Sequence, residues 1–258
     1  MPVDSHCHLN YPGLVEDQAG VIARAREAGV SAMLAISTRA AEWDDVIGLA
    51  ARETDIWASV GVHPHEADHH PDVEAARLIA ASAHPRVIGI GETGLDYYYD
   101  KSDRARQRDS FRAHIAAARE TGLPLIVHTR DAEADTLDIL AEEQGRGPFG
   151  AVIHCFTASA DFGRQALAMG FYISLSGIVT FKNAADLADF ASEIPADRLL
   201  VETDAPYLAP VPKRGRTCEP AFVTHTAAFV AARRGVDYAT LDRQTTDNFY
   251  RLFAKAAR

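Results

Sequence analysis

The amino-acid sequence predicts a parallel (β/α)8 TIM barrel, and three observations lead to this fold class. Short apolar segments alternate eight times with segments of helical period along 258 residues, the usual size of such a barrel. The apolar segments are nearly continuous, as expected of strands in a parallel sheet that is buried on both faces. The first strand leads into His-Cys-His, where an open doubly wound sheet would carry a glycine-rich turn.

Each element follows from its local composition. Segments rich in Val, Ile and Leu predict strands at residues 2–8, 30–37, 56–63, 87–92, 123–128, 151–155, 172–176 and 199–202. Helical spacing of apolar residues predicts helices at 15–28, 40–53, 71–82, 103–121, 131–144, 159–169 and, more briefly, 182–192. A loop rich in proline, lysine and arginine follows at 209–220, and helices at 221–234 and 238–256 close the chain. We find no linker or internal repeat, so we predict a single domain over residues 1–258.

The composition narrows the class of protein. Hydrophobic residues make up 47% of the chain, which argues against disorder, yet no apolar segment approaches the ~18 residues of a membrane span. The N-terminus does not resemble a signal peptide, and three cysteines without a C-x-x-C pair suit a reducing compartment. We therefore expect a cytoplasmic protein without membrane attachment or an obligate protein partner.

Histidines and carboxylates mark the ends of six predicted strands. In a (β/α)8 barrel these ends meet at the C-terminal face. The residues are His6 and His8, His63 and His65, Glu92, His128, His154, and Glu202 and Asp204. A single buried histidine is more often hydrogen-bonded to a backbone carbonyl than to a metal. Six such strand ends at one point would bring buried, unpaired charges together, at a cost in folding free energy. A bound metal ion lowers that cost by pairing with the charges.

The number of donors favours two divalent ions over one. Four histidines and two carboxylates exceed the roughly three ligands of a single ion with an open position, and they suit an ion pair about 3.5–4 Å apart. His6 and His8 leave an extended strand on one face and are predicted to hold the first ion. His128 and His154 are predicted to hold the second.

Two carboxylates complete the predicted set. Glu92 is placed to bridge the two ions and therefore counts both as a ligand and as a catalytic residue. Asp204, on the eighth strand beside the first, is predicted to bind the first ion and to accept a proton from the attacking water.

The same motifs carry a resemblance to a known family. H-x-H, G-V-H-P-H, G-E-T-G-L-D-Y-Y-Y, H-T-R, H-C-F and E-T-D-A-P, followed by the closing N-F-Y-R-L-F, resemble the TatD family of metal-dependent deoxyribonucleases, in the amidohydrolase-like superfamily. The resemblance implies a TIM barrel, hydrolysis of DNA and the same six ligands, and it adds His63 as a phosphate-binding or positioning residue. One loop departs from the family pattern G-K-R-N-E-P, because residues 215–220 read G-R-T-C-E-P. Substrate contacts of that loop are therefore not carried over.

We predict substrate contacts at His63, Arg130 and Tyr97. Arg130 can neutralise a phosphate oxygen, and the alternative is a pairing with Asp131 or Glu133. Tyr97, with the two tyrosines that follow it, can stack on a base, and the alternative is packing within the loop.

The charge distribution leads to a prediction about the substrate. A net charge of −10 disfavours binding along a long duplex, whereas Arg130 and the basic residues 213–216 concentrate positive charge at the mouth. We therefore expect exonuclease-like action on single-stranded DNA or frayed ends. The cofactors are two divalent metal ions, Mg or Mn in activity, while Zn, Fe or Ni fit the same donors in the purified protein.

Two other functions compete with the nuclease. An amidohydrolase-type enzyme would hydrolyse a small amide, ester or lactone, but many such dinuclear enzymes bridge their ions with a carboxylated lysine, and no lysine falls at a strand end here. A non-catalytic metal-binding module would not need Asp204 as a base. The remaining histidines, His69, His70, His84, His114 and His225, are predicted to be solvated, and Cys7 to point into the barrel wall.

Overall fold

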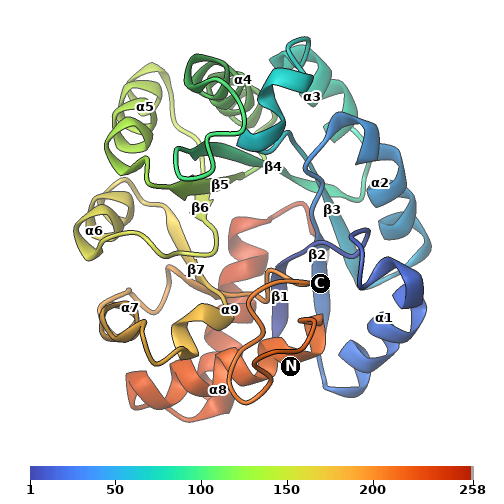
Figure 1. Cartoon of the computed structure of the whole chain (residues 1–258), viewed down its shortest axis with the longest axis vertical. Helices are drawn as coiled ribbons and strands as arrows, with labels where there is room; N and C mark the ends of the chain where they lie inside the picture. The colour runs from blue at the N-terminus through green and yellow to red at the C-terminus, as the bar shows by residue number, and fades with distance from the viewer. Residues whose placement is uncertain (257–258) are drawn as a thin grey trace.

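Eight parallel strands form one sheet in the order β1 to β8, with the helices in a ring outside them (Figure 1). The computed structural model describes residues 1–256, so the last two residues of the predicted domain lie outside the described residues. The strands are β1 Val3–Cys7, β2 Ala32–Ala35, β3 Ile56–Val60, β4 Val87–Asp96, β5 Leu125–Arg130, β6 Ala151–Ile153, β7 Tyr172–Leu175 and β8 Leu199–Val201. The TIM-barrel prediction is confirmed.

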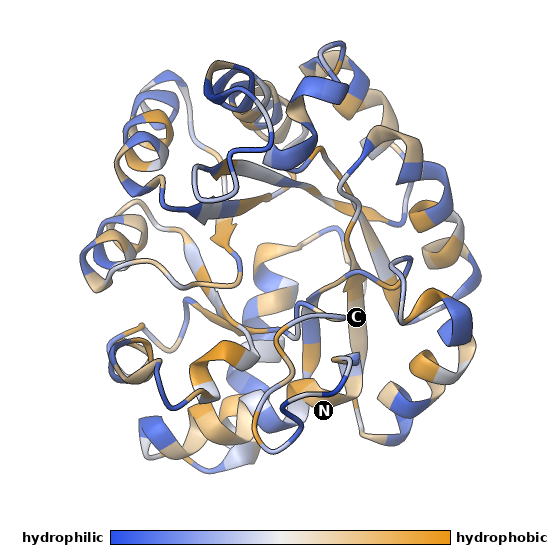
Figure 2. Cartoon of the chain, in the orientation of Figure 1, coloured by the Kyte–Doolittle hydropathy of each residue, from blue (hydrophilic) through white to orange (hydrophobic). Residues whose placement is uncertain are grey.

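The helices turn apolar residues toward the strands and charged residues outward (Figure 2). The α-helices are α1 Gln18–Glu27, α2 Trp43–Arg52, α3 Ala75–Ser82, α4 Arg104–Thr121, α5 Glu133–Arg146, α6 Ala160–Ala168, α7 Ala185–Phe190, α8 Val223–Arg234 and α9 Tyr238–Leu252. Short 3-10 helices are η1 Val15–Asp17, η2 Ala40–Glu42, η3 Pro64–His69, η4 Gly177–Thr180 and η5 Pro220–Phe222. In the described part of the chain, no helix is long and apolar enough to cross a membrane. The cytoplasmic location stays a prediction.

Helices α1, α2 and α3 begin three to four residues later than predicted, and α7 and α9 differ from their predicted bounds for local reasons. Helix α7 is shorter than the predicted 182–192, because η4 and the turn after it occupy the preceding residues. Helix α9 ends at Leu252 rather than at residue 256, and its last turns place Phe249 and Phe253 against the interior of the barrel. Both rings are fully buried beside Ile88 and Ile126, so they close the barrel at the end opposite the strand C-termini. Truncating either ring would cost about 3–5 kcal/mol of stability.

The barrel closes at a seam between β1 and the residues that follow β8. Cys7 forms a parallel bridge with Ala205, and the Asp204 amide donates to the His6 carbonyl over 3.0 Å. The seam therefore sets the first and last of the predicted ligands side by side.

Strands β4 and β5 run further than the sequence predicts. β4 continues from 92 to Asp96 and β5 from 128 to Arg130, because the added residues pair with one another. This pairing requires a glycine at one point, since a Cβ atom on Gly94 would lie 2.0 Å from the His128 carbonyl oxygen. The extension carries Asp96 and Arg130 beyond the predicted strand ends.

Candidate metal centre

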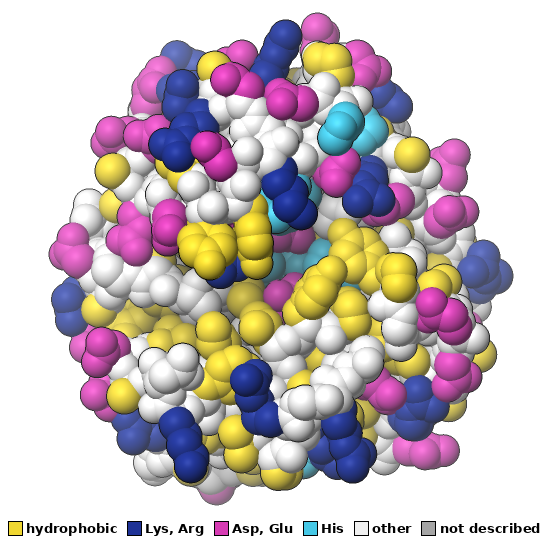
Figure 3. Space-filling view, viewed as in Figure 1, with side chains coloured by type: hydrophobic (Ala, Val, Ile, Leu, Met, Phe, Trp, Pro, Cys, Tyr) yellow, Lys and Arg dark blue, Asp and Glu magenta, His cyan; other side chains and the backbone are white. Residues whose placement is uncertain are grey.

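The six predicted ligands converge at the C-terminal face of the barrel. Figure 3 shows a hollow at the centre of this face, with histidine and acidic side chains at its floor. His6, His8, Glu92 and His154 are buried, whereas His128 and Asp204 keep some exposure to the hollow. The ligands come from β1, β4, β5 and the turns directly after β1, β6 and β8.

The first group of donors surrounds one oxygen of Glu92. Glu92 Oε2 lies 3.4 Å from His6 Nε2 and 3.7 Å from His8 Nε2. Asp204 Oδ1 lies 3.7 Å and 3.4 Å from the same two nitrogens, which are 3.3 Å apart. A tetrahedral ion with bonds of about 2.1 Å separates its ligands by about 3.4 Å. The donors therefore fit a divalent ion at their centre.

The second group surrounds the other oxygen of Glu92. Glu92 Oε1 lies 2.8 Å from His154 Nε2, 3.0 Å from His128 Nδ1 and 3.3 Å from His63 Nε2. The two imidazole nitrogens of His128 and His154 are 3.4 Å apart. Each carboxylate oxygen of Glu92 thus faces a different set of imidazoles, which is the arrangement expected of a bridging ligand. His63, which the sequence predicts to contact the substrate, lies within this second group of donors.

The electrostatics of the centre favour an ionised Glu92. Burial alone would raise the pKa of this carboxyl, but the imidazoles around it, His154 first, hold the pKa well below its ordinary value. Burial also lowers the pKa of His63 to about 4, so this imidazole is neutral at pH 7. For Asp204, burial opposes ionisation, and the hydrogen bond with His8 outweighs it and lowers the pKa. Both carboxylates are therefore charged and able to bind cations.

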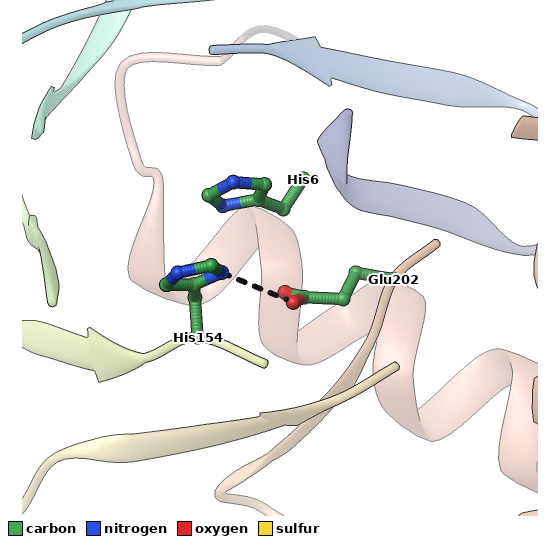
Figure 4. Close-up of side chains that lie close together, drawn as sticks. All are labelled: His6, His154 and Glu202. Atoms are coloured by element: carbon green, nitrogen blue, oxygen red, sulfur yellow. Dashed lines mark hydrogen bonds and ion pairs between the residues drawn. The ribbon is translucent and has the colours of Figure 1, made fainter. Parts of the chain in front are cut away.

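Two further carboxylates orient the ligand histidines, as is common in metal sites. Glu202 Oε1 lies 3.3 Å from His154 Nδ1 and also accepts from the Cys155 amide over 2.7 Å (Figure 4). A proton on Nδ1 of His154 leaves its Nε2 free to face Glu92. The imidazole of His6 stacks on that of His154 with 3.9 Å between the ring centroids, which further fixes its orientation.

Asp96 contacts His128 as Glu202 contacts His154. Asp96 Oδ2 lies 3.3 Å from His128 Nε2 and 2.7 Å from His65 Nε2. Its other oxygen accepts from the amides of Tyr98 and Tyr99 over 3.0 Å and 2.9 Å. Burial opposes its ionisation, but these bonds, that of His128 first, hold the pKa of Asp96 below its ordinary value. This role was missed from the sequence, although Asp96 stands four residues beyond Glu92 and thus on the same strand face.

One histidine is placed differently from its prediction. His114 was predicted to be solvated, which is wrong: it is fully buried in α4. Its Nδ1 donates to the Ser110 carbonyl over 2.7 Å, and its Nε2 accepts from the Val62 amide over 2.9 Å. Burial lowers the pKa of His114 to about 4. Helix α4 therefore anchors the backbone directly before His63.

Arg130 is exposed beside the centre. Its guanidinium lies 4.1 Å from the ring centroid of Tyr98 and 4.7 Å from that of Tyr99. Glu133, one of the predicted alternative partners of Arg130, instead accepts from the amide and the hydroxyl of Ser159 over 2.8 Å and 2.5 Å. The hydroxyl of Tyr97 donates to Asp135 over 2.6 Å, so the exposed aromatic surface beside Arg130 comes from the two tyrosines that follow.

The loop that departs from the family pattern is held by its basic residues and its cysteine. Arg214 stacks on Phe181 at 3.7 Å from the ring centroid. Cys218 is buried, and its amide donates to the Pro206 carbonyl over 3.0 Å, whereas Thr217 is exposed. Cysteine thus serves here as a small buried residue. Cys7 faces the barrel wall as predicted, with its Sγ 3.5 Å from the Leu34 carbonyl oxygen.

Comparison with known proteins identifies the family of the chain. The sequence matches the TatD related DNase family over residues 3–254. The chain belongs to this family. It is 47% identical over 254 residues to an uncharacterized metal-dependent hydrolase, YcfH of Escherichia coli, covering 97% of this chain and 95% of the relative. It is 41% identical over 247 residues to a Cronobacter sakazakii protein named 3′-5′ ssDNA/RNA exonuclease TatD, covering 93% of each.

The family also accounts for the fold. The crystal structure of YjjV, a TatD homologue from Escherichia coli, superposes with a TM-score of 0.91 at 27% identity, covering 98% of this chain and 97% of that one. The resemblance predicted from the sequence motifs is confirmed, and the protein is a metal-dependent hydrolase. The ligand assignments, the number of ions and the metal stay predictions.

Proposed function

We propose that the protein is a deoxyribonuclease that trims single-stranded DNA or frayed ends with two divalent ions. The observation that carries the proposal is the placement of Glu92, whose two oxygens face separate groups of imidazoles 2.8–3.7 Å away. Divalent ions in such a pair lower the pKa of water and neutralise charge on a phosphate oxygen. His6, His8 and Asp204 would hold one ion and His128 and His154 the other, with Glu92 contacting both groups.

Asp204 supplies the base. Its carboxylate is ionised at neutral pH because its pKa is lowered, and its side chain is partly exposed to the hollow. It can therefore accept a proton from a water molecule that enters from the mouth. The neutral His63 carries its proton on Nε2, because its Nδ1 accepts from the His65 amide, and Nε2 faces Glu92. A hydrogen bond from His63 to a phosphate oxygen would replace the contact with Glu92. Arg130 then pairs with a second phosphate.

The distribution of charge supports action at a strand end. The protein carries a net charge of −10, so positive charge is local: Arg130 on one side of the mouth and the loop with Arg214 on another. Tyr98 and Tyr99 offer exposed rings on which a base can stack. The name of the Cronobacter relative, an exonuclease of single-stranded DNA and RNA, supports the same substrate class. Mg²⁺ or Mn²⁺ suits the activity, and Zn²⁺, iron or Ni²⁺ can occupy the same mixed donors.

The test is a time course with Mg²⁺ on linear single-stranded, blunt duplex and covalently closed circular DNA. We expect the linear single strand to be degraded fastest and the circle to persist. Arg130→Ala should lower kcat/KM about tenfold by removing a charged hydrogen bond to phosphate. Arg104→Ala is the matched control, because Arg104 pairs with Asp100 on the same rim. Circles cut as fast as linear strands would contradict action at ends, and hydrolysis of small esters alone would favour the amidohydrolase-type function.

A further inference from the structure

A groove with no assigned role opens between the loops that follow β6 and β7. Its volume is about 590 Å³, within the range of small-molecule sites. The residues that line the groove include Thr157, Ala158, Ile178, Asn183, Ala184 and Leu187. Figure 3 shows an apolar strip that runs from the central hollow toward the side where Figure 1 places α6 and α7. The groove therefore belongs to the same face as the metal centre.

The groove begins directly beside the ligand His154. The next residue, Cys155, contacts Ser176, with 3.2 Å between Sγ and Oγ. Thr157 and Ile178 each stand two residues beyond this contact, and two residues span at most about 7 Å. Thr157 is three residues from His154, so the near end of the groove lies within about 11 Å of this predicted ligand.

The floor of the groove is closed. The ring of Phe190 in α7 packs 5.1 Å from that of Phe156, and a Cβ atom on Gly163 in α6 would lie 2.4 Å from the Phe190 ring. Helices α6 and α7 thus leave no passage between them. A flat group can enter from the mouth, but a continuing polymer cannot leave on the other side, so the occupant must stand at the end of a chain.

We propose that this groove binds the base of the terminal nucleotide, the one that hydrolysis releases. The inference rests on the proposed nuclease function and deepens it. Ile178 and Leu187 offer apolar contact to the faces of the base, and the exposed amide of Asn183 can hydrogen-bond to its edge. Arg214 stacks on Phe181, which lies between Ile178 and Leu187 in the sequence, and adds positive charge beside the end of the DNA strand. The rest of the strand leaves over Tyr98, Tyr99 and Arg130, on the open side of the mouth.

The experiment compares two single-stranded oligonucleotides that differ only in whether the terminal nucleotide at the trimmed end carries a base or is abasic. The wild-type protein should release the abasic nucleotide about tenfold more slowly, in keeping with the loss of one stacked base. Ala184→Phe fills the groove and should release both nucleotides at the same slow rate. Ala185→Phe is the matched control, because Ala185 is exposed and does not line the groove. This variant should behave as the wild type.

The outcomes separate the two proposals. Equal wild-type rates on the two oligonucleotides would overturn the groove as a base site and leave the nuclease function standing. An Ala184→Phe variant that lowers both rates while keeping their tenfold ratio would also overturn it, because the base would then still be recognised. Failure of the wild-type protein to cut either oligonucleotide would refute the nuclease function and this inference together.

Discussion

Replacing Asp96 with asparagine should disable His128 as a ligand without removing a single atom from the metal centre. In the wild-type protein the carboxylate oxygen Oδ2 accepts from His128 Nε2, so the proton sits on Nε2 and the lone pair of Nδ1 faces Glu92. An asparagine at this position must turn its amide nitrogen toward one of two neighbours. The first neighbour is the pair of imidazoles of His128 and His65, which share Oδ2, and the second is the pair of backbone amides of Tyr98 and Tyr99.

The structure decides which way the amide turns. Facing its nitrogen toward the two backbone amides would lose two hydrogen bonds of about 1 kcal/mol each, or about 30-fold in population. The nitrogen therefore faces the two imidazoles and donates its two hydrogens to Nε2 of His65 and of His128, which moves the proton of His128 to Nδ1. There it donates to Glu92 Oε1, 3.0 Å away, and the ligand lone pair is lost. Changes at such orienting carboxylates cost about 10–100-fold in metal affinity or activity, and we expect the upper end of that range.

The assay has two readouts. Metal titration should show that one ion binds about 100-fold more weakly in Asp96→Asn than in the wild-type protein, and long-range ¹⁵N NMR of the metal-free protein should show the proton of His128 on Nδ1. Asp100→Asn is the control, because Asp100 is exposed on the same loop and pairs with Arg104 rather than with a histidine of the centre. Wild-type metal affinity in Asp96→Asn, together with an unchanged tautomer, would refute the reasoning.

Three further predictions test the centre and its support. Activity should vanish in excess chelator and return with Mg²⁺ or Mn²⁺, and full activity after chelation and dialysis would exclude the two-ion site. Glu92→Gln should lose at least one ion by elemental analysis, whereas Asp204→Asn should keep most of its metal and lose most turnover, because an amide can bind a cation but cannot take a proton. His114, with a pKa of about 4 when folded and about 6.5 when unfolded, stabilises the protein fully above pH 6.5 and loses that contribution as the pH falls toward 4. Denaturant unfolding at pH 7 and pH 4.5 should therefore show a loss larger by about 2–3 kcal/mol in the wild type than in His114→Gln, and equal losses would show that His114 is not held neutral.

The convergence of the six predicted ligands was predictable because each stands at the end of a recognisable strand, and barrel geometry brings such ends together. The residues that orient them were harder to assign. Asp96 acts on His128 only because β4 and β5 pair beyond their predicted ends, and the strand pattern stops at Glu92. Glu202 reaches His154 across a turn at Cys155. The φ of Cys155 is 42°, a conformation that glycine adopts most easily, and the absence of a glycine here hides the turn in the sequence.

The groove and the buried histidine depend on packing between elements far apart in the sequence. His114 lies in a helix with charged neighbours, and only the approach of α4 to the β3 turn shows that it is buried. The closed floor of the groove depends on the fit of Phe190 in α7 against Gly163 in α6, which hydrophobic spacing within either helix does not encode. Local patterns therefore located the chemistry but not the shape of the surface around it.

The seam between β1 and β8 has a consequence for how the protein is made. His6 and His8 are synthesised nearly two hundred residues before Asp204, which completes their group of donors. Synthesis proceeds from the N-terminus, so a nascent chain that has emerged as far as β7 holds both histidines and Glu92 but lacks Asp204. On the proposed mechanism, a product that terminates before β8 would lack both the base and the strand that closes the barrel, so it should be inactive.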